Sequence, residues 1–267
     1  MRTKWHPRLS SDVPPAKAGE PSHWKLRDKH RRHVAKLAAG DTGARVIAPA
    51  DTDGTLFRKA VVLPEAEKNI TKDGVYSSKT GAVVKKGRWR GRKIRTLTLE
   101  ERATCPRQCE NWSICYGNAT PWARRLVHGD DLEFLLYEEI KRISEKHALV
   151  IRLHMLGDFY SLQYVEFWRA MMRRFDIAVF GYTAHPADSK IGAALAALAD
   201  EMWERFSMRF SGGYQPPHVA RAITVQSAEE ARAADAIVCP AQIGRVANCG
   251  ACGLCWHSKR TIAFLEH

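Results

Sequence analysis

The sequence predicts an α/β fold arranged as a partial (β/α) barrel of about six parallel strands. The first observation behind this prediction is an alternation along residues 93–239 between short apolar runs, typical of buried strands, and longer amphipathic patterns, typical of helices. The second is that glycine or polar residues follow several of the apolar runs directly, as expected where a strand ends in a loop. An open doubly wound sheet uses the same units and is the alternative arrangement.

The first elements of this pattern follow from periodicity and capping residues. Polar and apolar side chains alternate in residues 94–99, which indicates a short strand. Residues 130–146 have an apolar helical stripe, and the aspartates at their start suit the positive end of a helix. Residues 149–156 form an apolar run typical of a buried strand, and Ser161 is a suitable N-cap for a helix that reaches about residue 175.

The alternation continues towards the C-terminus. We expect further strands at residues 177–182, 208–211, 222–225 and 236–239, with a helix at residues 189–206 between the first two. Ser227 and Glu230 have the spacing of a capping box, so a helix is expected to begin after Ser227.

The N-terminal part differs in composition. Residues 1–23 hold four prolines and scattered charges, as in a flexible arm. Residues 23–37 suit a basic helix, and residues 46–62, with a turn signal inside them, suit a hairpin. We therefore divide the chain into a basic N-terminal extension, an α/β domain and a cysteine-rich C-terminal segment, at residues 1–78, 79–238 and 239–267.

Positive charge is concentrated ahead of the first cysteine. The net charge is +13, and residues 1–104 carry 24 Lys and Arg against 11 Asp and Glu, whereas the remaining residues carry 18 of each. Such a basic extension suggests a nucleic-acid partner, and a solvated, solubilising tail is the alternative. No apolar run is long enough for a membrane span and no secretory signal is recognisable, so we expect no membrane partner and a reducing cytoplasmic location.

The densest positive charge lies in residues 85–95, where seven of eleven residues are Lys or Arg. Cations bind phosphates and a tryptophan can stack on a base. We therefore expect this segment to contact nucleic acid, through Lys85, Lys86, Arg88, Trp89, Arg90, Arg92 and Lys93. A charged turn that leads into the core is the alternative.

Three cysteines lie within eleven residues, spaced C-x3-C-x5-C: Cys105, Cys109 and Cys115. A structural zinc ion or a fully ligated iron–sulfur cluster takes four protein ligands. A [4Fe-4S] cluster held by three cysteines leaves one iron open to another ligand. We therefore predict a cluster loop with an open iron.

The other four cysteines are near the C-terminus: Cys239, Cys249, Cys252 and Cys255. The last three read C-x2-C-x2-C, as in small bacterial ferredoxins, and Cys239 precedes a proline, as the final ligand of that run does. Four thiolates can hold one iron–sulfur cluster, which we favour, or one structural zinc ion. An odd total of seven cysteines also argues against a framework of disulfides.

Parallel strands place their carboxyl ends at one edge, where α/β proteins bind ligands. The three-cysteine loop, residues 157–159, residues 183–185, residues 211–213 and Cys239 all follow predicted strands. We expect these segments to converge on one site.

The pattern Cys105-Pro-x2-Cys109-x5-Cys115-Tyr116, with Gly157-Asp158-Phe159 and Cys249-Gly-Ala-Cys252-Gly-Leu-Cys255-Trp256, resembles the phage "gene product eighty-eight" domain over residues 79–267. That family has no settled activity, so the resemblance implies kinship, and the host cytoplasm as location for a phage-encoded chain.

The layout is also similar to the radical S-adenosylmethionine (SAM) superfamily, in which a three-cysteine loop after the first barrel strand holds a [4Fe-4S] cluster and SAM chelates the open iron. The resemblance implies that Gly157 and Asp158 hold the SAM amino group, and that Ser211 and Gly212 meet its carboxylate or ribose. The usual spacing is C-x3-C-x2-C with an aromatic residue before the last cysteine, whereas here the last gap is five and Tyr116 follows it.

This resemblance implies an enzyme that generates a 5′-deoxyadenosyl radical with the help of a reductant protein and acts on a nucleotide or nucleic acid. The candidate catalytic residues are Arg152, His154 and His185; a core position is the alternative for His154. A non-catalytic nucleic-acid-binding protein with structural Fe–S or zinc sites is the second hypothesis. A nuclease using Glu139 and Lys141 is a third, but this pair lies in a helical pattern where a strand is needed.

Overall fold

The computed structural model describes residues 47–211 and 215–266, so the predicted arm at residues 1–23 and the basic helix at residues 23–37 lie outside the described part of the chain. The strands are β1 Val61–Val62, β2 Lys72–Asp73, β3 Lys93–Thr96, β4 Arg125–Leu126, β5 Leu149–Leu153, β6 Ile177–Thr183, β7 Phe206–Ser211, β8 Arg221–Val225, β9 Ile237–Val238 and β10 Ile262–Leu265. The helices are α2 Asp130–Ser144, α3 Leu162–Arg174, α4 Lys190–Met202, α5 Ala228–Ala233, α6 Cys249–Cys252 and α7 Leu254–His257. No helix in this part of the chain is long and apolar enough to cross a bilayer.

The fold is mixed α/β with an eight-stranded sheet in the order β2-β3-β5-β6-β7-β8-β10-β9. The edge strand β2 runs antiparallel to β3, and the other pairings in this sheet are parallel. From β3 to β8 the spatial order follows the order along the chain. A separate two-stranded sheet joins β1 to β4 in parallel. The α/β prediction is therefore confirmed.

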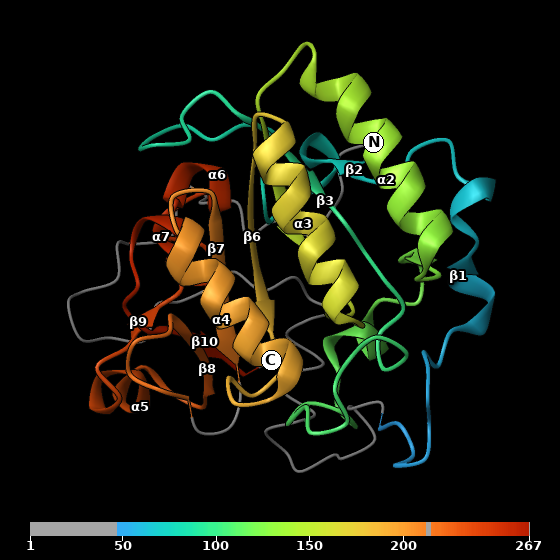
Figure 1. Cartoon of the computed structure of the whole chain (residues 1–267). Coiled ribbons are helices and arrows are strands. Elements are labelled where there is room, and N and C mark those ends of the chain that lie inside the picture. Colours follow the sequence, from blue (N-terminus) through green and yellow to red (C-terminus); the bar gives the residue numbers. More distant parts are fainter. Residues whose placement is uncertain (1–46, 212–214, 267) are drawn as a thin grey trace.

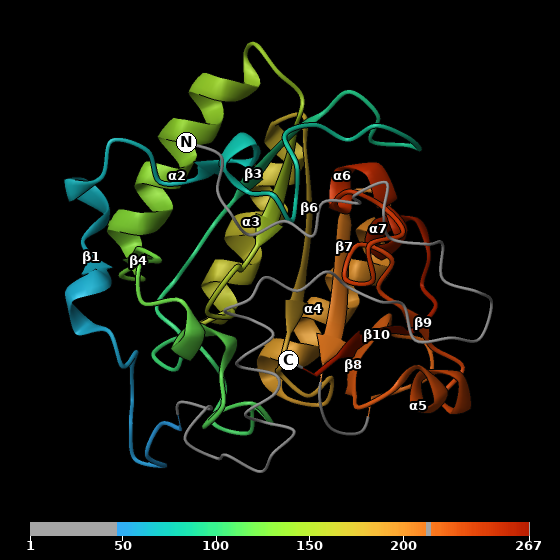
Figure 2. The same ribbon diagram turned by 180° about the vertical axis from the view of Figure 1, so that it is seen from behind.

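One face of the sheet is covered by α2, α3 and α4 (Figure 1). The main hydrophobic core lies between them, because Leu149, Ile151 and Leu153 of β5 point towards the helices and are fully buried. The intervening Val150 belongs to a smaller core on the opposite face, with Phe180 and Trp256. Figure 2 shows α6 and α7 on that second face.

The helix boundaries follow the capping residues closely. The Ser161 and Ser189 hydroxyls accept hydrogen bonds from the backbone N–H groups of Tyr164 and Gly192 at 3.0 Å each, at the starts of α3 and α4. The Ser227 hydroxyl caps α5 in the same way. These polar side chains satisfy backbone donors that have no partner within their own helix.

Three parts of the sequence-based account need correction. The hairpin expected at residues 46–62 is wrong, because β1 pairs in parallel with β4, more than sixty residues away. The strand β10 was not predicted, and it lies between β8 and β9. The N-terminal extension predicted at residues 1–78 and the cysteine-rich C-terminal segment predicted at residues 239–267 therefore each contribute a strand, β2 and β10, to the central sheet.

Glu139 of α2 holds the segment that enters β2. Its carboxylate accepts hydrogen bonds from the backbone N–H of Thr71 at 3.1 Å and from the backbone N–H of Ile70, and it lies 3.3 Å from Nη2 of Arg95 in β3. The side chain of Glu139 is only 5% exposed, so these contacts are shielded from solvent. The proposed nuclease role for Glu139 has no support here, because the carboxylate is committed to these structural contacts.

We therefore expect Glu139→Ala to reduce the free energy of unfolding by about 3–5 kcal/mol, because it leaves the buried backbone N–H groups of Ile70 and Thr71 without their acceptor and removes the buried carboxylate that pairs with Arg95. Urea unfolding followed by circular dichroism measures this. Glu138→Ala, at the exposed neighbouring position, is the control and should change the value by less than about 0.5 kcal/mol. Equal losses in the two variants would contradict the role given to Glu139.

Candidate metal centres

The three-cysteine loop connects β3 to β4 at the carboxyl end of β3. All three thiols are half-buried and free of disulfides. The Sγ atom of Cys115 accepts a hydrogen bond from the backbone N–H of Gly117 at 3.3 Å, at the start of the 3₁₀ turn Tyr116–Ala119. Cys109 and Cys115 raise the pKa of Cys105, and Cys115 raises that of Cys109, so the three thiols lie near one another.

A buried ion pair lies beneath this loop. The guanidinium of Arg125, in β4, donates to both carboxylate oxygens of Glu101, at 2.7 and 3.1 Å, and the two side chains are 0% and 1% exposed. Arg125 also donates to the backbone carbonyls of Gly117 at 3.0 Å and Thr120 at 3.2 Å. Charge-assisted, bidentate contacts of this kind are strong and directional, so they fix the end of the loop to β4.

A second buried arginine holds the middle of the loop. Arg102 has a φ of +67°, a conformation that side-chain-bearing residues rarely adopt. Its guanidinium donates to the backbone carbonyl of Trp112 at 3.0 Å and to Oδ1 of Asn118 at 2.7 Å. The Asn118 amide in turn donates to the carbonyl of Ser113 at 3.0 Å. The loop therefore depends on internal polar contacts rather than on an apolar core.

Gly157 and Asp158 lie against this loop, at the carboxyl end of β5. The hydroxyl of Thr104, next to Cys105, accepts the backbone N–H of Asp158 at 3.0 Å. Gly157 has a φ of +84°, and a Cβ there would lie 2.6 Å from the Thr104 hydroxyl and 2.7 Å from Leu99. Only glycine fits such a close approach. The structure thus brings Gly157 and Asp158 to the cysteines, as the convergence of strand ends predicts.

The Asp158 carboxylate is almost completely buried and joins the ends of β5 and β6. Its oxygens accept the backbone N–H groups of Phe159 at 2.8 Å and Ala184 at 2.7 Å. Burial raises the pKa of Asp158, and the nearby His185 together with these donors lowers it. The same charge raises the pKa of Cys105 and Cys109, so the carboxylate faces the thiols as well as the backbone.

Burial keeps the loop thiols in their neutral form in the absence of a metal. Desolvation is the main cause that raises the pKa of Cys109 to about 11, with smaller contributions from Cys115 and Asp158. The positive charges of Arg102 and Arg125 act in the opposite direction and lower the pKa of Cys115. A metal must displace these protons to bind, and the two guanidiniums favour the resulting thiolates.

The C-terminal cysteines form a second group, on the sheet face opposite α2, α3 and α4. Cys239 follows β9, Cys249 and Cys252 lie in α6, and Cys255 lies in α7. The hydroxyl of Tyr182, in β6, is 3.0 Å from the Sγ atom of Cys255. Burial raises the pKa of Cys249 to about 12, and the charges that act on it are those of Arg152, Cys255, Cys239 and Lys79, which therefore surround it.

Arginines fasten the α6–α7 segment to the sheet. Arg209 of β7 is fully buried and donates to the backbone carbonyls of Cys255 at 3.2 Å and Arg260 at 2.7 Å. Arg88 donates to the carbonyl of Trp256, and the Trp256 ring stacks on Trp89 with centroids 5.2 Å apart. The segment that carries Cys249, Cys252 and Cys255 therefore packs on the sheet, with Cys249 and Cys255 against the smaller core.

The two groups differ from a mononuclear metal site in their spacing. Among residues 47–211 and 215–266, which include all seven cysteines, no three His, Cys, Asp or Glu side chains are gathered around a point where one ion would bind. Zinc–sulfur bonds are about 2.3 Å long, so a tetrahedral zinc ion needs sulfurs less than about 4 Å apart. A four-iron cluster binds each thiolate to a different iron, so its cysteine sulfurs lie farther apart than those around one zinc ion. The arrangement of the cysteines in this structure is therefore not that of a preformed zinc site.

The predicted catalytic residues occupy different environments. Arg152, in β5, faces the C-terminal cysteines, and its guanidinium lies 5.7 Å from the centre of the Tyr182 ring. His154 is buried on the helix side, 3.2 Å from the Tyr164 hydroxyl, and packs on Phe159. His185 is buried, and its Nε2 lies 2.8 Å from the carbonyl oxygen of Phe159. The three side chains thus do not share one pocket, and His154 has the core position given above as the alternative.

The two remaining predicted ligands lie at the end of β7. The Ser211 hydroxyl donates to the carbonyl of Thr183 at 3.0 Å, at the same sheet edge as Asp158. Gly212 lies outside the described residues.

The segment predicted to contact nucleic acid is divided between surface and core. Trp89 is 2% exposed, so stacking on a base is not available to it; its Nε1 instead donates to the carbonyl of Glu204 at 2.8 Å. Three cations have partners within the protein: Arg88 with Glu204 at 3.0 Å, Arg92 with Asp176 at 2.7 Å, and Lys93 with His147 at 2.9 Å. Lys85, Lys86 and Arg90 are exposed, and Arg88 is exposed as well as paired.

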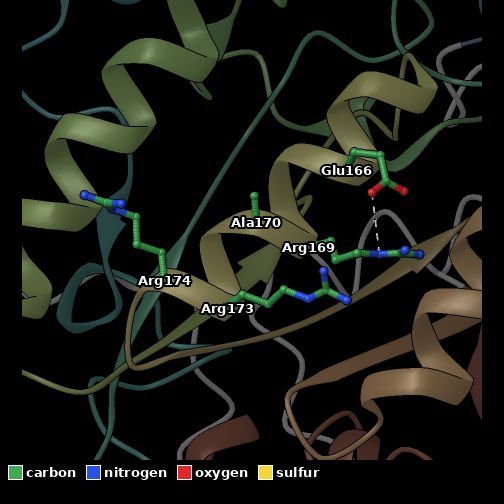
Figure 3. A pocket seen from close by; sticks show the side chains of 5 residues that line it. All are labelled: Glu166, Arg169, Ala170, Arg173 and Arg174. Atoms are coloured by element: carbon green, nitrogen blue, oxygen red, sulfur yellow. Dashed lines mark ion pairs between the residues drawn. The ribbon is translucent and has the colours of Figure 1, made fainter.

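A shallow depression on the outer face of α3 is unrelated to the cysteines. It is lined by Glu166, Arg169, Ala170, Arg173 and Arg174 (Figure 3). Arg169 pairs with Glu166 and with Glu201, each at 3.6 Å, and Arg173 pairs with Glu201 at 2.7 Å. Arg169 and Arg173 thus have carboxylate partners on this helix face, and the Arg174 guanidinium lies over the rings of Tyr137 and Phe175.

Sequence reasoning missed the side chains that hold the two cysteine groups in place. Glu101, Arg102 and Arg125 flank the first group in sequence, and a charged residue amid an apolar and turn-rich stretch is a weak signal of burial. Arg209 offers a better signal, because it lies between Met208 and Phe210 in a predicted strand. Comparison with protein families, with curated proteins and with solved structures gives no match to this chain.

We expect Arg125→Met to lower the free energy of unfolding by about 3–5 kcal/mol, because Glu101 is left buried without its cation. The same change should expose the loop thiols, so that alkylation of Cys109 and Cys115 in metal-free protein, followed by mass spectrometry, becomes faster. Arg124→Met is the control: Arg124 is 72% exposed and pairs with Glu67 at the surface, so its loss should cost less than about 1 kcal/mol. Unchanged thiol reactivity in Arg125→Met would contradict the role of the ion pair in shaping the loop.

His154 gives a prediction about pH. Burial lowers the pKa of His154 from 6.5 to about 3, so the folded protein holds it neutral while the unfolded chain protonates it below pH 6.5. This stabilisation is present above pH 6.5 and is lost as the pH falls towards 3. Wild-type protein should lose about 2 kcal/mol more than His154→Phe between pH 7 and pH 5.

Denaturant unfolding at the two pH values measures this difference. His147→Asn removes an exposed histidine and should keep the wild-type dependence on pH. Parallel curves for wild type and His154→Phe would show that His154 is not held neutral by burial.

Proposed function

We propose that this chain is an iron–sulfur protein of the radical-SAM kind, whose three-cysteine loop holds a [4Fe-4S] cluster with one open iron. The observation that carries the proposal is the position of Gly157 and Asp158 against the loop, fixed by the 3.0 Å hydrogen bond from the Asp158 N–H to Thr104. Three thiols and one carboxylate lie at the carboxyl ends of parallel strands, which is where α/β proteins carry out their chemistry.

The order of the sheet supports a barrel-like arrangement. In a doubly wound sheet the strand order reverses at a switch point and helices cover both faces. Here β3, β5, β6, β7 and β8 follow one another in space as they do along the chain, and the helices between them lie on one face (Figure 1). This is the succession found in a (β/α) barrel, so we propose a partial barrel whose inner face carries the C-terminal cysteines.

When bound, such a cluster supplies one electron, taken from a low-potential reductant protein, to cleave SAM into methionine and a 5′-deoxyadenosyl radical. The chain's own residues would position SAM. The Asp158 carboxylate would receive the ammonium group, and Ser211 with Gly212 would meet the carboxylate or ribose. Arg102 and Arg125 would favour the thiolate form of the loop cysteines.

We propose that the four C-terminal cysteines hold a second cluster, with zinc as the alternative ion. A nucleotide or nucleic acid is the proposed substrate class, with contacts from the exposed Lys85, Lys86 and Arg90 beside α6 and from the basic N-terminal residues. Kinship with the phage "gene product eighty-eight" domain is also part of the proposal, on the cysteine patterns of both groups.

A non-catalytic, metal-braced nucleic-acid-binding protein is the second candidate. The observation that favours it is the Asp158 carboxylate, which already accepts two backbone N–H groups, from Phe159 and Ala184. In this alternative Asp158 joins two strand ends, and the loop cluster or zinc ion has no SAM bound to it.

The two candidates are separated by anaerobic reconstitution with iron and sulfide. The enzyme proposal expects about eight irons per chain and, after reduction, an electron paramagnetic resonance signal that changes when SAM is added. Replacing Cys105, Cys109 and Cys115 by Ala should remove about half of the iron and the whole effect of SAM. Cys249→Ala is the matched variant and should leave the effect of SAM in place.

Full iron loading with no effect of SAM would favour the binding protein. Zinc in both sites, with no iron retained, would overturn the iron–sulfur proposal altogether. Asp158→Asn refines the result: if Asp158 receives the SAM ammonium group, this variant should retain iron and weaken SAM binding by about tenfold or more.

A further inference from the structure

We propose that Arg152 is the charge partner of the C-terminal centre and donates hydrogen bonds to the sulfur atoms of a cluster held by Cys239, Cys249, Cys252 and Cys255. This inference rests on the iron–sulfur proposal for that site. It assigns Arg152 a positioning role at the C-terminal group, in place of the catalytic role suggested by the sequence.

Arg152 lies in the middle of the sheet, on the face that carries the cysteines. In the register of β5 it is opposite Thr96 of β3 and Phe180 of β6. The residue is 7% exposed. Its guanidinium lies over the ring of Tyr182, whose hydroxyl is 3.0 Å from the Sγ atom of Cys255.

The guanidinium has donors without acceptors. Nε and Nη1 of Arg152 are enclosed by protein, and neither meets a hydrogen-bond acceptor in the described part of the chain. A buried cation that is not paired costs several kcal/mol of stability, so an anion is expected at this position in the working protein.

Arg209 of β7 lies on the same face of the sheet as Arg152 and provides a comparison, because its role is structural. Arg209 is fully buried, and its Nε, Nη1 and Nη2 atoms donate to the backbone carbonyls of Cys255, Arg221, Arg260 and Ser258. Arg209 thus has an acceptor for each of its nitrogens and needs no ligand. Arg152 does not, and the difference indicates that its partner is not part of the polypeptide.

The surrounding groups identify the class of that partner. The positive charges of Arg152 and Lys79 both act on Cys249. A cluster with four thiolate ligands is net negative, and it presents sulfides and thiolates as acceptors to N–H and O–H donors. Arg152 and Tyr182 would supply such donors from the sheet. Hydrogen bonds and positive charge next to a cluster raise its reduction potential.

The test uses the full-length chain with Cys105, Cys109 and Cys115 replaced by Ala, so that only the C-terminal centre binds iron. Arg152→Met removes the charge and the donors, and Arg152→Lys keeps the charge. Arg173→Met, on the outer surface of α3, is the matched control for losing an arginine. For each protein we would measure iron and sulfide content, the midpoint potential of the cluster, and the thermal midpoint of the metal-free form.

The proposal expects Arg152→Met to stabilise the metal-free protein and to destabilise the cluster in the reconstituted protein. Without metal, Arg152→Met should unfold at a higher temperature than its parent, because a buried unpaired charge is gone. After reconstitution, its cluster should be lost faster in air and have a more negative potential. Arg152→Lys should fall between the parent and Arg152→Met, and Arg173→Met should match the parent throughout.

A normal cluster whose potential is the same in Arg152→Met and the parent would overturn this inference and leave the iron–sulfur proposal intact. A lower thermal midpoint for metal-free Arg152→Met would also overturn it, since Arg152 would then stabilise the protein through contacts of its own. If the parent itself retains zinc and no iron, the proposed function fails, and that outcome is visible before any Arg152 variant is made.

Discussion

The buried ion pair between Glu101 and Arg125 is the contact on which the first cysteine group depends. Residues 100–124, which follow the buried Leu97 and Leu99 and lead into β4, contain no fully buried apolar side chain, so hydrophobic packing contributes little to the shape of the loop. The ion pair fixes the shape of the loop instead. The Arg125 guanidinium is neutralised by the Glu101 carboxylate and still has N–H groups left to bind backbone carbonyls. Gly117 and Thr120 accept them, and the loop is thereby tied to β4. Breaking such a pair from one side is costly, which makes the loop an integral part of the fold.

Hydrogen bonds from arginine side chains to backbone carbonyls also hold other parts of the molecule in place. Arg102 holds the middle of the loop, Arg209 and Arg88 hold the α6–α7 segment, and Arg205 donates to the carbonyls of Phe175 and Ile177 beneath α4. A planar guanidinium can bind several carbonyls at once, which suits irregular segments whose backbone acceptors are not paired in a helix or sheet. Much of the positive charge in the described part of the chain therefore serves the fold. Net charge alone thus overstates the surface available to a polyanion.

The regular elements could be predicted because local rules and tertiary packing agree in them. The helix α3 begins after a serine cap and its apolar stripe faces the sheet, and β5 is an apolar run that is buried on both faces. The short strands could not be found in the same way. Two residues, as in β1 or β9, carry no period, and β10 joins the sheet only because α6 and α7 return the chain to it.

The candidate site was predictable in part. The cysteine groupings and the proximity of Gly157 and Asp158 to the first group follow from spacing and from the rule that parallel strands end at one edge. The environments of His154 and Trp89 do not follow, because the sequence does not say which face of a strand or turn is buried. Arg152 is the clearest case: its position in an apolar strand is visible in the sequence, whereas its lack of an acceptor is visible only in the structure.

The central claim is that three thiols hold a cluster whose fourth metal position has no protein ligand. The most direct measurement is a crystal structure of anaerobically reconstituted protein, with anomalous diffraction recorded on both sides of the iron absorption edge. The account predicts iron at Cys105, Cys109 and Cys115, with one iron that no side chain binds and that lies on the side of Asp158. A zinc ion there, or a fourth side chain that completes the coordination, would contradict it.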